Sequence, residues 1–202
     1  MTDSEFSVSI PRLSTERLLL REFRRGDFEA FGSYYSDDVA MAFLGGVVDR
    51  RTAWRLFSAG AGGWVLNGAG WWAIELRSTG ELVGQVGAFF REHQFVPSGV
   101  EELELGWTVA RSHWRQGIAK EAMTAVLAHV LERHSGHPVI AHIDPSNVAS
   151  IAVSRALGMT YDRDIDFYGH PCARYVLDRA RSERGDGAAA RSPIDSGNPG
   201  AL

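Results

Sequence analysis

The sequence predicts a mixed α/β domain in which helices are layered on a central sheet. Short apolar runs of strand length alternate with longer stretches whose apolar residues recur at helical spacing. The chain has 202 residues and 45% hydrophobic residues, which is enough for one core of ordinary size. We therefore expect a single domain over residues 1–180.

One strand and two helices are predicted in the first 70 residues. Residues 18–23, Leu-Leu-Leu-Arg-Glu-Phe, are typical of a strand. Asp27 and Asp49 each precede apolar residues at helical spacing and are typical helix caps. The run 60–63 contains three glycines, Gly60, Gly62 and Gly63, and is expected to fray or end the second helix.

A β-hairpin and a further strand are predicted in the middle of the chain. The runs 71–76 and 82–90 flank a short turn, Ser78-Thr-Gly-Glu, and a strand-like run follows at 101–109. This succession of strands forms the centre of the predicted sheet.

The second half predicts two helices, a strand between them and a closing hairpin. Residues 117–133 carry the clearest helical periodicity, and Asn147 starts a second helix that Gly158 stops. The run 139–143 is a short buried strand, and 160–168 with 173–177 form a hairpin.

The residues after the domain, 181–202, lack apolar periodicity. They are mainly Gly, Ala, Ser, Pro and Asp, which predicts a disordered C-terminal tail.

Composition excludes several classes of function. The net charge of −4 argues against a nucleic-acid partner and suits weak attraction of cationic substrates. A single cysteine, Cys172, allows no intramolecular disulfide. No apolar run approaches the roughly 20 residues that span a bilayer, and the polar, acidic N-terminus is unlike a signal peptide. A cytoplasmic protein without a membrane partner is expected, as a monomer or homodimer.

The segment between the strand at 101–109 and the helix at 117–133 predicts an anion site. Backbone N–H groups at a helix start carry partial positive charge, and Gly117 lets a ligand approach the backbone closely. Arg115 and Lys120 add charge. The spacing of a P-loop is missing, and Gly84 and Gly87 lie inside a strand rather than opening a helix, as a dinucleotide-binding loop would.

This loop resembles the acyl-CoA pyrophosphate loop of the GNAT superfamily of N-acetyltransferases, Gln/Arg-x-x-Gly-x-Gly/Ala. Trp114 stands where Gln or Arg is usual, a departure common in the branch of ribosomal-protein N-terminal acetyltransferases. The resemblance to that branch covers roughly residues 14–178. Its matching segments are Thr15-Glu-Arg-Leu-Leu-Leu-Arg, Leu82-Val-Gly, Glu104-Leu-Gly-Trp, Trp114-Arg-Gln-Gly-Ile-Ala and Asn147-Val-Ala-Ser-Ile-Ala-Val-Ser-Arg-Ala-Leu-Gly-Met.

The resemblance implies a mixed, mostly antiparallel sheet of six to seven strands flanked by about four helices. It implies acetyl-CoA as co-substrate, no metal, and two splayed central strands that hold the pantetheine arm. One backbone N–H near the strand end would polarise the acetyl carbonyl. The residues expected to bind the cofactor are Trp107, Thr108, Val109, Arg115, Gln116, Gly117, Ile118, Ala119, Lys120, Asn147 and Ser150.

Glu104 is the expected general base, acting directly or through water. The alternative is that Glu102 and Glu104 are solvated, or bind the substrate cation without taking its proton. Ser154 occupies the position where many relatives carry a tyrosine acid. Ser150 is therefore a candidate to hydrogen-bond the leaving sulfur, or else a first-turn partner of the Asn147 cap.

The acceptor is expected to be a primary amine. A peptide α-amine has a pKa near ~8 and a lysine amine near ~10.4, so a weak base favours the α-amine. Protein N-termini, free amino acids, aminoglycosides and polyamines all remain open. The acceptor pocket is expected over residues 37–70 and the loops 93–99 and 167–171. One or two of a mostly core set of aromatic residues could form its wall, as could those near the first helices; the two sets are Trp64, Trp71, Trp72, Phe89 and Phe90, and Tyr34, Tyr35 and Phe43.

Three further interpretations follow from the sequence. A catalytically inactive acyl-CoA sensor and an interaction module that binds no CoA are both compatible with the same fold. His134, His137 and His142 lie close in sequence, but a helix end, a loop and a strand do not present convergent metal ligands.

Overall fold

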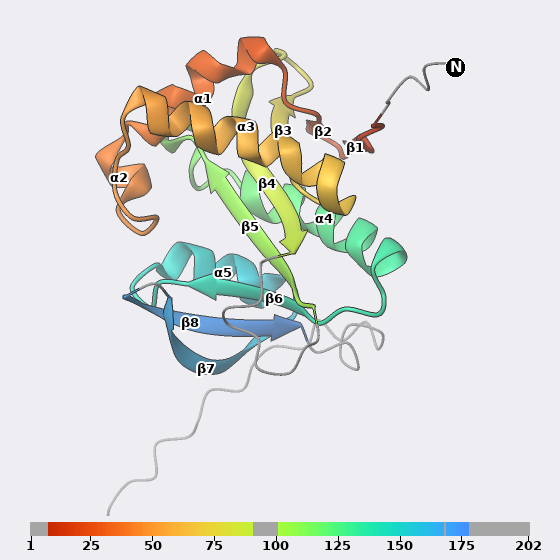
Figure 1. Ribbon diagram of the computed structural model, residues 1–202, viewed down its shortest axis with the longest axis vertical. Helices are drawn as coiled ribbons and strands as arrows, with labels where there is room; N and C mark the ends of the chain where they lie inside the picture. Colours follow the sequence, from red (N-terminus) through yellow and green to blue (C-terminus); the bar gives the residue numbers. More distant parts are fainter. Residues whose placement is uncertain (1–7, 91–100, 168, 178–202) are drawn as a thin grey trace, which may run out of the picture.

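The computed structural model describes residues 8–90, 101–167 and 169–177 (Figure 1). Its helices and strands, in chain order, are β1 Leu13–Ser14, β2 Leu18–Arg21, η1 Arg25–Asp27, α1 Phe28–Tyr35, α2 Asp38–Met41, α3 Arg50–Asn67, β3 Trp71–Leu76, β4 Leu82–Phe90, β5 Leu103–Val109, η3 Arg111–His113, α4 Ile118–Arg133, β6 Val139–Ile143, α5 Val148–Ala156, β7 Met159–Phe167 and β8 His170–Leu177. The predicted tail, 181–202, and the loop 93–99 lie outside the described residues.

One sheet of eight strands runs through the described residues in the order β1-β2-β3-β4-β5-β6-β8-β7. All neighbouring pairs are antiparallel except β5 and β6, which are parallel. The predicted mixed, mostly antiparallel sheet is confirmed. The strand beyond the predicted seven is β1. It has only two residues and is too short to show an alternating pattern in the sequence.

Helices cover both faces of the sheet (Figure 1). On one face α4 packs its apolar stripe, including Met123 and Val126, against Val86 of β4 and Leu105 of β5. On the other face α1 reaches β4, where Gln85 donates a hydrogen bond of 2.9 Å to the hydroxyl of Tyr35. The side chains of Gln85 and Val86 point to opposite faces of the sheet, as expected for neighbouring residues of a strand.

The prediction that the run Gly60 to Gly63 frays or ends the second helix is wrong. α3 continues to Asn67 and ends at Gly68, which has a φ of +64°. Gly60 serves close packing instead, because a Cβ there would lie 3.2 Å from the ring of Phe23 and 3.4 Å from Trp71. The short helix α2 was also not predicted, so there are five α-helices among the described residues rather than about four.

Asp27 precedes α1 as predicted, but its carboxylate does not cap that helix. It accepts two hydrogen bonds, of 2.7 and 2.9 Å, from the guanidinium of Arg21, whose side chain is only 3% exposed. The same guanidinium donates to Glu75 of β3. The buried arginine therefore joins β2, β3 and the start of α1, and its charge is fully paired.

Candidate active site

The central strands diverge as the resemblance implies. β5 and β6 pair only through Leu103 with Val139 and Glu104 with Ile140. Beyond Glu104 the strands separate, and the last residues of β5 keep ladder partners only on β4. Figure 1 shows the resulting V between β5 and β6.

A cleft of about 400 Å³ lies between α2, the end of β5, the start of α4 and the start of α5. All of the predicted cofactor-binding residues line it except Gln116, and Glu104 does not line it. Its lining residues are Val39, Ala40, Phe43, Leu44, Trp107, Thr108, Val109, His113, Trp114, Arg115, Gly117, Ile118, Ala119, Lys120, Asn147, Ala149, Ser150 and Val153. Apolar groups thus form one wall, and the helix start and its cations form the other.

The loop before α4 is shaped to present backbone donors. Gly117 has a φ of +77°, and Arg115 takes the left-handed conformation, rare for a side-chain-bearing residue, with a φ of +60°. None of the described side chains caps α4. Across the same described residues, Arg115 and Lys120 form no ion pair. An uncapped helix start beside two unpaired cations is suited to an anion.

The loop before α4 is anchored by the turn between β1 and β2. Arg17 donates 2.9 Å to the backbone oxygen of Gln116 and 2.6 Å to the carboxylate of Glu121. Thr15 donates to the same carboxylate. Burial alone would raise the pKa of Glu121, but hydrogen bonds from Thr15 and Arg17 outweigh it and lower the pKa. Gln116 therefore contributes to the anchoring of the loop rather than to the lining of the cleft.

The unusual Trp114 has a defined place in this loop. Its indole Nε1 donates a 2.7 Å hydrogen bond to the backbone oxygen of Val109, at the end of β5. The ring also lines the cleft and remains 40% exposed. The tryptophan therefore ties the loop to the strand while it supplies an apolar surface.

Two of the predicted roles at α5 meet in one turn. The side chain of Asn147 accepts a 3.0 Å hydrogen bond from the backbone N–H of Ser150, so it caps the helix. Both residues also line the cleft. Ser154 is fully buried, donates a hydrogen bond to the backbone oxygen of Ile151 and does not line the cleft.

The strand carboxylates have different partners. The carboxylate of Glu102 pairs with Arg174 of β8. Glu104 is buried, and its Oε2 lies 3.3 Å from Nδ1 of His142 on β6; each side chain is 7% exposed. Sequence reasoning considered His142 only as a poor metal ligand. It missed this contact, since the pairing of β5 with β6 has no signal in the sequence.

An aromatic surface lies beside Glu104 on the same face of the sheet. Phe89 is paired with Glu104 across β4 and β5, and its ring stacks on Trp71 at 5.0 Å between centroids. Trp71 lies flat against β5 because Gly106 has no side chain; a Cβ there would meet the indole at 2.5 Å. Phe43 instead lines the cleft, and Tyr34 is buried among the residues of α1–α3.

No group of three or more metal-ligating side chains occurs in the described part of the chain. The rings of His134 and His137 contact the ring of Phe90 edge to face, with centroids 5.7 and 4.9 Å away. No described helix is long and apolar enough to cross a membrane.

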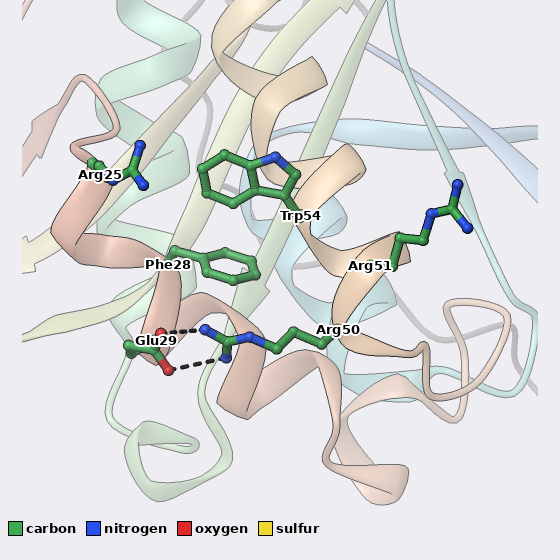
Figure 2. Close-up of a pocket in the computed structure, with 6 residues that line it drawn as sticks. All are labelled: Arg25, Phe28, Glu29, Arg50, Arg51 and Trp54. Atoms are coloured by element: carbon green, nitrogen blue, oxygen red, sulfur yellow. Dashed lines mark hydrogen bonds and ion pairs between the residues drawn. The ribbon is translucent and has the colours of Figure 1, made fainter.

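A second hollow, here called the arginine pocket, lies between the starts of α1 and α3 (Figure 2). Its volume is about 620 Å³, and it is lined by Arg25, Phe28, Glu29, Arg50, Arg51 and Trp54. Arg50 pairs with both carboxylate oxygens of Glu29 and lies 4.7 Å above the ring of Phe28. None of the predicted catalytic or cofactor-binding residues lines this pocket, although Arg50, Arg51 and Trp54 fall within the range 37–70 that was expected to form the acceptor pocket.

Comparison with known proteins identifies the family. Residues 17–160 match the family described as the acetyltransferase (GNAT) domain. YkkB of Bacillus subtilis (strain 168) is 32% identical over 168 residues, covering 81% of this chain and 94% of that protein. The N-acetyltransferase YnaD of the same organism, itself uncharacterized, is 29% identical over 73% of this chain and 81% of its own length.

Solved structures agree with this match. The acetyltransferase from Agrobacterium tumefaciens str. C58 superposes with a TM-score of 0.74 at 28% identity, covering 87% of this chain and 99% of that one. Two less similar structures, both in complex with coenzyme A, share the fold. They are RimL, the ribosomal L7/L12 alpha-N-protein acetyltransferase (17% identity, TM-score 0.64, 83% and 99% covered), and the aminoglycoside acetyltransferase AAC(6')-Ib (15%, 0.67, 83% and 98%).

Proposed function

Because the chain belongs to the GNAT family of acetyltransferases, which makes it an acetyl-CoA-dependent acetyltransferase, we propose that it acetylates a primary amine. In this proposal the amine attacks acetyl-CoA directly while both substrates are bound. The observation that carries the proposal is the cleft at the divergence of β5 and β6. Its uncapped helix start and two unpaired cations suit a pyrophosphate, and its apolar wall suits a pantetheine arm.

Each predicted cofactor-binding residue that lines the cleft has a role in this proposal. Gly117, Ile118, Ala119 and Lys120 offer backbone N–H groups to the pyrophosphate, and Arg115 and Lys120 add charge. The backbone of residues 107–109 pairs with the pantetheine amides, and one N–H there polarises the thioester carbonyl. Asn147 holds α5 at the cleft, and the Ser150 hydroxyl donates a hydrogen bond to the leaving sulfur.

Proton transfer falls to Glu104. The neutral amine nitrogen attacks the thioester carbon, the carbon–sulfur bond breaks, and coenzyme A leaves as the thiol or thiolate. The proton that the amine loses passes to Glu104, directly or through water. The carboxylate of Glu102, which is paired with Arg174, is less suited to this task.

The acceptor amine is placed beside Glu104, on the face of the sheet that carries Trp71 and Phe89. Aromatic rings attract an ammonium group before it is deprotonated. Proteins with this fold include an α-N-protein acetyltransferase and an aminoglycoside acetyltransferase, so the fold does not select the acceptor. The lower pKa of a peptide α-amine, near ~8, favours that class over lysine.

A thiol-release assay over a panel of amines tests the proposal. We expect turnover with peptides that have a free N-terminus, and slower turnover with peptides whose only free amine is lysine. Faster turnover of the lysine peptides would overturn the preference for the α-amine.

Binding measurements separate the remaining alternatives. Calorimetry with acetyl-CoA should show saturable binding together with turnover. Binding without turnover on any amine of the panel would instead support an acyl-CoA sensor. Absence of binding would support an interaction module.

A further inference from the structure

We propose that His142 is the positioning residue of the catalytic carboxylate, with its Nδ1–H donated to Glu104. The inference rests on the proposed function, since it gives Glu104 the role of general base. His142 Nδ1 lies 3.3 Å from Glu104 Oε2, and both side chains are almost fully buried. A general base must direct a carboxylate oxygen at the proton that it removes. A hydrogen bond from the imidazole to the other side of the carboxylate would hold it in that orientation.

The position of His142 follows from where the two strands part. The last ladder pair of β5 and β6 is Glu104 with Ile140, and His142 lies two residues beyond it on the same face of β6. No ladder hydrogen bond joins the strands at that level. The contact between His142 and Glu104 therefore spans the apex of the V, at the inner end of the proposed thioester path.

The imidazole has a donor available for this role. His142 Nδ1 is buried, and it forms no hydrogen bond of good geometry with any described residue despite the close carboxylate. Buried polar atoms are almost always hydrogen-bonded. We therefore expect the Nδ1–H of His142 to donate to the carboxylate that lies closest to it, that of Glu104. Hydrogen bonds of catalytic groups are often poorly aligned before substrate binds and tighten in the reactive complex.

Neighbouring charges favour this assignment. Arg174 is the ladder partner of His142 on β8, but its guanidinium pairs with Glu102 of β5 and Asp162 of β7. The ring of Phe167 packs on the imidazole at 5.3 Å between centroids. The arginine is thus committed elsewhere, and the aromatic ring limits water around the histidine. A hydrogen bond in such surroundings is stronger than one in water.

The first test reads the contact without using catalysis. In ¹⁵N spectra of the protein, the imidazole signals of His142 are assigned as those lost in His142→Asn. We expect the Nδ1 signal to move when Glu104 is replaced by Gln, since the acceptor changes from a carboxylate to an amide. An unchanged signal overturns the proposal, whatever the enzyme acetylates.

The second test uses a matched pair of variants. Asn places an amide nitrogen close to the position of Nδ1, whereas Leu has a similar size and no donor. We expect His142→Leu to lower kcat on the order of tenfold or more, with KM for acetyl-CoA unchanged, and His142→Asn to recover most of kcat. His129→Leu, a half-buried histidine that packs on Trp72 outside the cleft, is the control and should keep wild-type kcat.

A double-mutant cycle completes the design. If His142 acts through Glu104, then His142→Leu should have no further effect on kcat once Glu104 is Gln. Independent losses in the double variant, or equal losses in the Leu and Asn variants, contradict the positioning role. A wild-type kcat for Glu104→Gln alone would contradict the proposed function itself, so the two failures are distinguishable.

Discussion

The cleft and the arginine pocket differ in how the helix start that borders each of them is satisfied. In the arginine pocket, Arg50 is held by both oxygens of Glu29 and covers Phe28 (Figure 2). Arg25 and Arg51 form no ion pair among the described residues, but the start of α3 is capped by the carboxylate of Asp49. In the cleft, Arg115 and Lys120 likewise have no acidic partner among the described residues, and the start of α4 is uncapped. The uncapped helix start, rather than the size of the hollow or the presence of cations, distinguishes a site prepared for an anion.

The largest difference in turnover is expected between Glu104, at the point where β5 and β6 part, and Glu29 of the arginine pocket. Replacing Glu104 by Gln removes the proposed base, and we expect kcat/KM to fall by roughly a hundredfold or more. Glu29→Gln removes a carboxylate from the arginine pocket and should leave kcat/KM unchanged. Thiol release with one α-amine peptide measures both. Equal effects of the two substitutions would break the comparison.

The second largest difference is expected in the binding of acetyl-CoA, when the cations of the cleft or those of the arginine pocket are removed. Removing Arg115 and Lys120 together, each as Ala, should raise the Kd for acetyl-CoA by about 10- to 100-fold, because charge-assisted hydrogen bonds to phosphate are lost. The matched double variant, Arg25→Ala with Arg51→Ala, should bind acetyl-CoA like the wild type. Calorimetry gives both constants. A raised Kd in the second variant would mean that acetyl-CoA binds in the arginine pocket rather than in the cleft.

A smaller effect concerns the anchor behind the loop. Hydrogen bonds from Thr15 and Arg17 lower the pKa of Glu121 in the folded protein. Its stabilisation is therefore complete above the unfolded pKa, near ~4.3, and is lost as the pH falls through the lower folded value. Glu121→Gln should reduce the free energy of unfolding by about 1 kcal/mol at pH 7. Urea denaturation should show a larger difference between the variant and the wild type at pH 7 than at pH 3.

The smallest effect is expected from the exposed ion pair of the arginine pocket. Arg50 lowers the pKa of Glu29, but both side chains are largely exposed, and such pairs add little to stability. Thermal melts of Arg50→Ala should coincide with those of the wild type within error. A clear loss of stability would mean that the pocket has a structural role that its exposure does not suggest.

The sequence predicted those elements whose signal is local. The periodicity of α4, the cap at Asn147 and the glycine before α4 all lie within a few residues of what they determine, and the structure has each of them. The continuation of α3 through its glycines could not be predicted, because Gly60 packs against Phe23, which follows β2, and Trp71, which begins β3.

The contact of Glu104 with His142 illustrates the same limit at the site. The two residues are distant in sequence, and only the register of β5 against β6 brings them together. A shift of one residue would turn one side chain to the opposite face of the sheet. Register between parallel strands is set by tertiary packing, so no local pattern reports it.

The short ladder between β5 and β6 makes the sheet a pair of plates joined by a narrow seam. One plate is β1–β5 and the other is β6–β8, with two residue pairs between them. A cofactor in the cleft would contact β5 of one plate and α5, which packs on β6 and β7 of the other, and so would form a second connection between them. Backbone amides on either side of the seam should then exchange with deuterated solvent more slowly in the presence of acetyl-CoA, and the two plates should become protected together.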